Sequence, residues 1–175
     1  MNSDSARLFL GLELDDASRH ALSLVCDELT ARNLRGKFYT PDRYHLTLCF
    51  LGNTPVSRIP ELQEVMDSVP CPPFSLTLSD LGTFKNGSIL WAGVKHCDIL
   101  HEYRARLADA LRNALFPVEE GEYHPHITLA RQFKSPMPSI DVPSVSFPVQ
   151  HATLFESTRI NDVLTYLPLY RSEFC

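Results

Sequence analysis

His45-Leu-Thr-Leu-Cys-Phe-Leu (HLTLCFL, residues 45–51) and His126-Ile-Thr-Leu (HITL, residues 126–129) share one pattern of histidine, apolar residue, threonine, apolar residue. Alternation of this kind predicts a β-strand, in which every second side chain points to the same face. The histidine and the threonine of each stretch are therefore expected on one face, with the leucine and isoleucine side chains in the core. A tetrapeptide that recurs 81 residues later also indicates two related lobes.

Similar elements precede each copy of the pattern. A strand at residues 7–14 and a helix from Asp15 and Asp16 to about residue 31 come before the first copy, and a strand at 89–94 and a helix from Asp98 to about residue 115 come before the second. The other expected elements are a helix between residues 57 and 70 and strands at 74–81, 123–131, 145–155 and 164–170.

This arrangement predicts an α+β fold, a single domain over residues 1–175 with signature strands near 45–51 and 126–131. Its two lobes of antiparallel strands are expected to be pseudo-symmetric and interleaved, with flanking helices. A pseudo-two-fold axis between the lobes would bring the two histidine–threonine faces opposite each other across a central cleft.

The charge of the chain excludes one class of nucleic-acid binder. The net charge is −5, whereas a protein that coats nucleic acid without specificity needs a broad basic surface. Any contact with RNA must therefore be local. One candidate is the run of residues 32–43, which carries Arg32, Arg35, Lys37 and Arg43 but only one acidic residue; a solvated loop with chance charges explains this run equally well.

The five cysteines are odd in number, scattered, and form no Cys-x-x-Cys pair, which argues against a disulfide framework and against a zinc site. The first residues show no cationic start followed by an apolar run, and no stretch has the roughly 18 apolar residues of a membrane span. We therefore expect a cytoplasmic protein with no membrane association.

The paired motifs suit phosphoryl chemistry. Cleavage of a phosphodiester needs a base, an acid, and donors to the non-bridging oxygens. His45 and His126 can fill the two proton-transfer roles near neutral pH, and the hydroxyls of Thr47 and Thr128 can bind the phosphate. Arg131 would add a planar cation, although strict alternation from His126 places it on the opposite face unless the strand bends or ends near residue 130.

Other interpretations of these residues remain open. Both histidines could simply satisfy hydrogen bonds at a sheet edge. His124 and His126 could begin a metal site, but no further ligands lie at a usable spacing, and we expect no metal and no cofactor. Cys49 shares the alternation of His45 and could be a thiol nucleophile, although an inert buried cysteine is the better interpretation.

The sequence resembles the 2H phosphoesterase superfamily, and in particular the bacterial RNA 2′,3′-cyclic phosphodiesterases, also called 2′-5′ RNA ligases. The resemblance covers nearly the whole chain: RLFLGLEL at 7–14 is similar to the family's first strand, HLTLCFLG at 45–52 to its first signature, and HPHITLAR at 124–131 to its second. The segment from residue 154 to residue 169 resembles its closing hairpin.

This resemblance implies metal-independent hydrolysis of a 2′,3′-cyclic phosphate of RNA to a 2′-phosphomonoester. It makes His45 and His126 the catalytic pair, and Thr47, Thr128 and Arg131 the phosphate ligands. It also implies that an RNA 5′-hydroxyl can replace water, which gives reversible 2′-5′ ligation, with tRNA halves as one candidate substrate.

Several questions stay open at this stage. Arg43, Tyr44 and Tyr39 are candidate RNA contacts beside the first motif, and the protein is expected to be a monomer. The pattern does not decide which histidine is the base. The alternatives to the hydrolase are a physiological tRNA-half ligase and a non-catalytic module that binds RNA ends.

Overall fold

The computed structural model describes residues 4–175, so the first three residues of the expected domain lie outside the described part. It contains three α-helices and nine strands within this range. The helices are α1 (Asp16–Ala31), α2 (Ile59–Asp67) and α3 (Asp98–Asn113). The strands are β1 (Ser5–Glu13), β2 (Lys37–Phe38), β3 (His45–Pro55), β4 (Phe74–Phe84), β5 (Ile89–Val94), β6 (His126–Arg131), β7 (Ser146–Val149), β8 (His151–Ile160) and β9 (Val163–Glu173).

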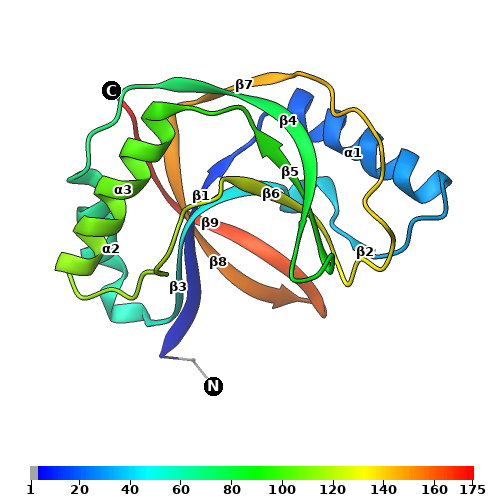
Figure 1. The fold of residues 1–175 in the computed structure, drawn as a ribbon. Helices are drawn as coiled ribbons and strands as arrows, with labels where there is room; N and C mark the ends of the chain where they lie inside the picture. Colours follow the sequence, from blue (N-terminus) through cyan, green and yellow to red (C-terminus); the bar gives the residue numbers. More distant parts are fainter. Residues whose placement is uncertain (1–3) are drawn as a thin grey trace.

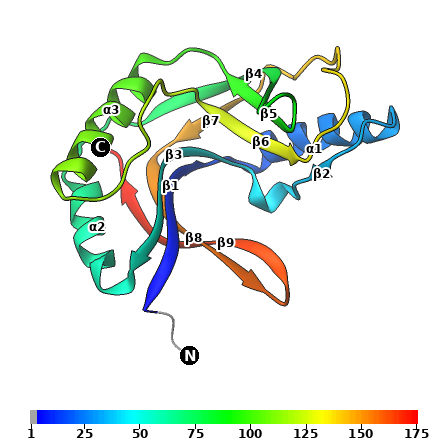
Figure 2. The ribbon, with the colours of Figure 1, turned by 60° about the horizontal axis from the view of Figure 1, so that its bottom comes forward.

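Eight of these strands follow one another through a single antiparallel sheet in the order β7-β4-β5-β6-β3-β1-β8-β9, and β2 pairs with β6. The order is mirrored about its centre, because β3-β1-β8-β9 in one half corresponds to β6-β5-β4-β7 in the other. Each half contains a strand–helix–strand unit, β1-α1-β3 or β5-α3-β6. The predicted α+β class and its two lobes of antiparallel strands are confirmed; the lobes are halves of one strongly curled sheet (Figure 2).

The helices lie at opposite ends of the molecule, α1 at one end and α2 with α3 at the other (Figure 1). Asp15 caps α1, since its carboxylate accepts a hydrogen bond from the Ser18 backbone N–H at 2.9 Å. Two of the helices contact the other half of the sheet: α1 contacts β7, and α3 contacts β3. The third, α2, contacts α3 and β9. Buried leucines on these helices close the core, among them Leu22 and Leu29 of α1 and Leu107 and Leu111 of α3.

The structure differs from the sequence-based expectations at several places. β6 begins at His126 and not at residue 123, and β4 and β9 extend beyond their expected ends to Phe84 and Glu173. The strand expected at residues 145–155 is two strands, β7 and β8, which lie in different halves of the sheet and separate at Gln150. β3 does not end at Gly52 but continues to Pro55, with Gly52 at a φ of 68°. The N-cap of α3 is Cys97, and Asp98 lies in its first turn.

No helix in the described range is long and apolar enough to cross a membrane.

Candidate active site

The two motif strands, β3 and β6, are neighbours at the centre of the sheet. They pair through Leu46 and Ile127, the apolar residues directly after each histidine, and both side chains are fully buried. This pairing brings the histidine and threonine of each motif to one cavity of about 490 Å³ on the concave face of the sheet. The cavity, called the cleft below, is lined by His45, Thr47, His126 and Thr128.

Each motif strand carries a β-bulge at the same position. In β3, Cys49 pairs with Leu10 and Thr47 with Gly11, which leaves Leu48 without a partner. In β6, Ala130 pairs with Leu90 and Thr128 with Trp91, which leaves Leu129 without one. The extra residue puts two consecutive side chains into the core and shifts the alternation by one.

The bulges decide two open questions about side-chain direction. Arg131 lines the cleft with His126, because the bulge returns the side chain five residues after the histidine to the cleft face. Cys49 does not lie beside His45, as strict alternation predicted, but is 3% exposed in the core. Burial raises the pKa of its thiol to about 11, so Cys49 is not an activated nucleophile.

His45 is held by hydrogen bonds at both ring nitrogens. Its Nδ1 lies 2.9 Å from the carbonyl oxygen of Arg43, and its Nε2 lies 2.9 Å from the Thr47 hydroxyl. Because a carbonyl only accepts, Nδ1–H is the donor, and Nε2 of the neutral ring accepts from Thr47. The ring lies 4.8 Å from that of Phe9, and burial lowers the pKa of His45 to about 4.

His126 has a matching arrangement on the other lobe. Its Nδ1–H donates to the carbonyl oxygen of His124 at 2.7 Å, and the ring of Phe84 stands perpendicular to the imidazole at 4.8 Å. Within residues 4–175, Nε2 has no hydrogen-bond partner and is open to the cleft. Burial lowers the pKa of His126 below its usual value of 6.5, and the hydrogen bond to the His124 carbonyl is the main effect that opposes it.

A network of aromatic and basic side chains connects the two lobes beside the histidines. Arg131 Nε donates to the Tyr39 hydroxyl at 2.6 Å, and the guanidinium of Arg43 lies 3.7 Å from the centre of the Tyr39 ring. Arg43 also donates to the hydroxyl of Tyr166 at 3.2 Å, and the edge of the Tyr166 ring contacts His45. Tyr39 therefore fixes the direction of Arg131 and is only 7% exposed.

One candidate RNA contact is wrong. Tyr44 is 1% exposed, and its hydroxyl lies 3.3 Å from Sγ of Cys26 in the core. Its position directly before His45 suggested the cleft, but alternation turns it to the opposite face of the strand.

The cleft also contains residues that the sequence did not single out. Three of them are the cations Arg7, Lys85 and Arg159, which line it together with Arg131; none of the described lining residues is a carboxylate. Exposed Phe50 lines it as well, and it occupies the same place in the first motif as Arg131 in the second. A comparison of the two motifs beyond the fourth residue was the signal that could have found it.

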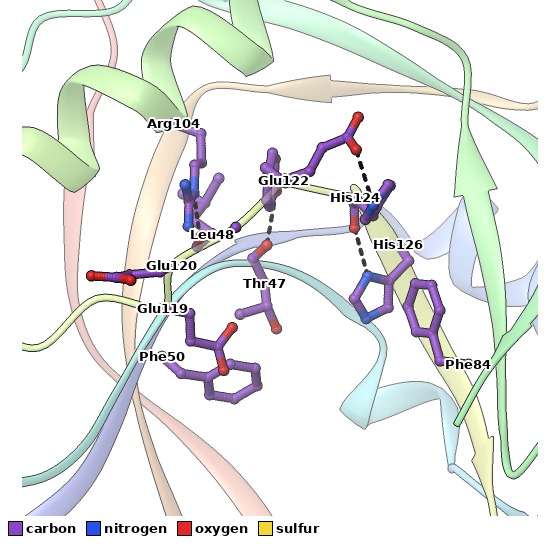
Figure 3. A pocket seen from close by; sticks show the side chains of 12 residues that line it. Thr47, Leu48, Phe50, Phe84, Arg104, Glu119, Glu120, Glu122, His124 and His126 are labelled. Carbon is purple, nitrogen blue, oxygen red and sulfur yellow. Dashed lines mark hydrogen bonds and ion pairs between the residues drawn. The ribbon is translucent and has the colours of Figure 1, made fainter. Parts of the chain in front are cut away.

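A smaller pocket of about 170 Å³ adjoins the cleft and shares Thr47, Phe50 and His126 with it. Three glutamates, Glu119, Glu120 and Glu122, make this pocket acidic, and Figure 3 shows Glu119 next to Phe50. Since carboxylates repel phosphate, an anionic substrate is directed to the cationic cleft and not into this pocket.

The described residues include no group of three or more His, Cys, Asp or Glu side chains that could hold a metal ion. His124, the residue that could have joined His126 in a metal site, is exposed, and its Nε2 lies 3.8 Å from a carboxylate oxygen of Glu122.

Two histidine–threonine pairs that face one cation-lined cleft define a class of protein, the phosphoesterases with paired histidines. The family model of the 2′-5′ RNA ligase superfamily matches residues 17–160. The chain belongs to this superfamily of 2H phosphoesterases, which confirms the resemblance carried by its two motifs.

Solved structures and curated relatives agree with this membership. The apo structure of E. coli LigT is 25% identical and superimposes with a TM-score of 0.89 over 98% of this chain and 99% of that one. The protein TT0787 of Thermus thermophilus is 27% identical, with a TM-score of 0.80 over 96% of this chain and 97% of that one.

Among the curated relatives, the RNA 2′,3′-cyclic phosphodiesterase of Thermotoga maritima is 26% identical over 96% of this chain and 95% of its own length. That of Geobacillus stearothermophilus is 29% identical over 85% of this chain but 51% of its own length, so the chain spans about half of that relative.

Proposed function

We propose that this protein hydrolyses 2′,3′-cyclic phosphate ends of RNA to 2′-phosphomonoesters, with His45 and His126 as the general acid and base. The observation that carries the proposal is that both histidines turn Nε2 towards one cleft while a backbone carbonyl holds Nδ1–H. The names of the curated relatives, RNA 2′,3′-cyclic phosphodiesterase, support the substrate, and E. coli LigT has been seen in complex with 3′-AMP.

In this mechanism one histidine takes a proton from water as the water oxygen attacks phosphorus. The bond between phosphorus and O3′ breaks, and the other histidine gives its proton to O3′, which leaves a 3′-hydroxyl and a 2′-phosphate. Thr47 and Thr128 donate hydrogen bonds to the non-bridging oxygens, where negative charge increases in the transition state. Arg131 binds the negative charge that the phosphate already carries in the ground state. The Thr47 hydroxyl must turn from His45 to the phosphate when substrate binds.

Replacement of either histidine tests the proposal. His45→Ala and His126→Ala should each lower kcat by about a hundredfold or more on an oligonucleotide with a 2′,3′-cyclic phosphate, given the usual contribution of acid–base catalysis. His96→Ala is the matched control, because His96 is exposed and pairs with Asp98 outside the cleft. Full turnover by both cleft variants contradicts the proposal, and loss of wild-type turnover with a chelator would indicate a metal enzyme.

The proposal also covers a second reaction, the oligomeric state and the cellular location. An RNA 5′-hydroxyl that replaces water would give 2′-5′ ligation, and tRNA halves are a candidate substrate; turnover of a cyclic-phosphate oligonucleotide with and without a 5′-hydroxyl partner compares the two reactions. A monomer belongs to the proposal as well, because one chain supplies both histidines and both threonines, and the chemistry needs no second subunit. The cytoplasm is supported by five cysteines that are all free.

A further inference from the structure

Two cations of the cleft have no partner among residues 4–175. Arg7 of β1 and Lys85, beside the tip of the β4–β5 hairpin, come from different halves of the sheet. In the described part of the chain, neither forms an ion pair or a side-chain hydrogen bond. Several arginines outside the cleft are paired with carboxylates, namely Arg32, Arg58, Arg112 and Arg171. Other cations in the same range, such as Lys95, also have no such partner, but Arg7 and Lys85 differ from them because they line the same cavity. In a chain with a net charge of −5, unpaired cations that line one cavity indicate an anionic ligand there.

The cleft continues past the catalytic centre on the side of these cations. A further cavity of about 460 Å³ is lined by Arg7, Lys85, Phe50 and Arg131, all of which also line the cleft. The two cavities therefore adjoin, with Arg131 on the wall of both. Glu119 is the one carboxylate on the wall of this further cavity, and its repulsion favours an anion on the side of Arg7 and Lys85.

Between the two cavities lies an apolar surface. The Phe50 side chain is 40% exposed, and the bulge in β3 turns it towards the cleft. An aromatic ring between cations is the usual arrangement for single-stranded nucleic acid, where the ring stacks on a base and the cations bind the backbone.

We infer that Arg7 and Lys85 form a second phosphate subsite, which binds the phosphodiester that precedes the terminal cyclic phosphate, while Phe50 contacts the terminal nucleoside. This inference rests on the proposed function. The expected substrate is the end of an RNA strand of at least two nucleotides. A cyclic mononucleotide has no second phosphate and cannot use the subsite.

The test compares two substrates in two variants. The substrates are adenosine 2′,3′-cyclic monophosphate and a triadenylate that ends in a 2′,3′-cyclic phosphate, and the variants are Arg7→Gln and Lys85→Gln. Each variant should lower kcat/KM about tenfold more for the trinucleotide than for the mononucleotide, the usual effect of one charged hydrogen bond. Lys95→Gln is the matched control, because Lys95 is an exposed lysine outside both cavities.

Salt gives a second measure. In wild-type protein, log kcat/KM for the trinucleotide should fall more steeply with log salt than for the mononucleotide, by about 0.7 for each added phosphate contact. Equal losses on both substrates, or equal salt slopes, overturn the subsite and leave the proposed hydrolase intact.

If wild-type protein turns over neither substrate, the proposed function fails, and binding then tests the subsite separately. The fluorescence anisotropy of a labelled triadenylate with a 2′-phosphate should show weaker binding to Arg7→Gln and Lys85→Gln than to wild type and to Lys95→Gln. Equal affinities overturn the subsite in that case.

Discussion

At the scale of single residues, the two histidines are alike in their hydrogen bonds and unlike in their surroundings. Each ring donates Nδ1–H to a carbonyl two residues earlier. His45 is enclosed by the rings of Phe9 and Tyr166, and its pKa falls to about 4, chiefly through burial and partly because of the charge of His126. A pair with unequal pKa values is suited to hold one proton, which is the state that acid–base catalysis requires.

The pH dependence of turnover follows from these two pKa values. Below about 4 both histidines are protonated and no base remains; above the lowered pKa of His126, which is less than 6.5, both are neutral and no acid remains. We expect kcat/KM to follow a bell between these limits, with its optimum on the acidic side of neutral, whichever histidine is the acid. Bound phosphate favours the imidazolium, so the optimum of kcat should lie at higher pH.

Initial rates from about pH 3.5 to about pH 8.5, a range that spans the usual titration of histidine, measure this profile, with circular dichroism at each pH to check folding. A kcat/KM that is flat across the range, or that peaks on the alkaline side of neutral, contradicts it.

Tyr39 offers a test of how Arg131 is positioned. Tyr39→Phe removes the 2.6 Å hydrogen bond to Arg131 Nε but keeps the ring under Arg43. Because Arg131 would bind phosphate in the ground state and the transition state alike, we expect KM to rise about tenfold with little change in kcat. Tyr170→Phe is the matched control, since it removes a 2.6 Å hydrogen bond to Asp67 outside the cleft.

The effect should also depend on Arg131. In an Arg131→Ala background, Tyr39→Phe should change KM far less than in wild type. The same rise in KM in both backgrounds would show that Tyr39 acts through another residue.

At the scale of elements, the bulges in β3 and β6 explain where inference from sequence succeeds and where it fails. The positions of His45, Thr47, His126 and Thr128 follow from alternation, because all four precede the bulge of their strand. Beyond it the same rule fails, as Cys49 shows. A bulge depends on which strand lies alongside and in which register, and neither is written in the local pattern.

The same reasoning applies to whole elements. α1 begins at its predicted cap because Asp15 and Asp16 act locally, and β5 has its expected bounds. β7 and β8 were expected as one strand, since no local signal reports that Gln150 marks a passage from one half of the sheet to the other. Local chemistry predicts an element, whereas long-range pairing decides where it ends.

At the scale of the whole molecule, the active site exists only because the two halves of the sheet meet. β3 and β6 are the only strands of the described chain that join the halves through the centre of the sheet, and Leu46 paired with Ile127 is the register position they share. The separation of His45 from His126 is therefore set by packing directly behind the two histidines. A displacement of about 1 Å between catalytic groups can cost about a hundredfold in rate.

Shortening the Leu46 side chain, at the position where β3 and β6 pair, should lower the rate by more than the accompanying loss of protein stability explains. Leu46→Ala and Leu62→Ala each remove a fully buried leucine side chain, and each should cost about 2–5 kcal/mol of unfolding free energy. Only Leu46 is at the position where the two motif strands pair, whereas Leu62 is in α2. Urea unfolding and kcat/KM, both measured where the variants are folded, should show a loss of about tenfold or more for Leu46→Ala and a smaller one for Leu62→Ala. Equal losses of kcat/KM in the two variants would mean that the pairing of Leu46 with Ile127 stabilises the fold without setting the geometry of the site.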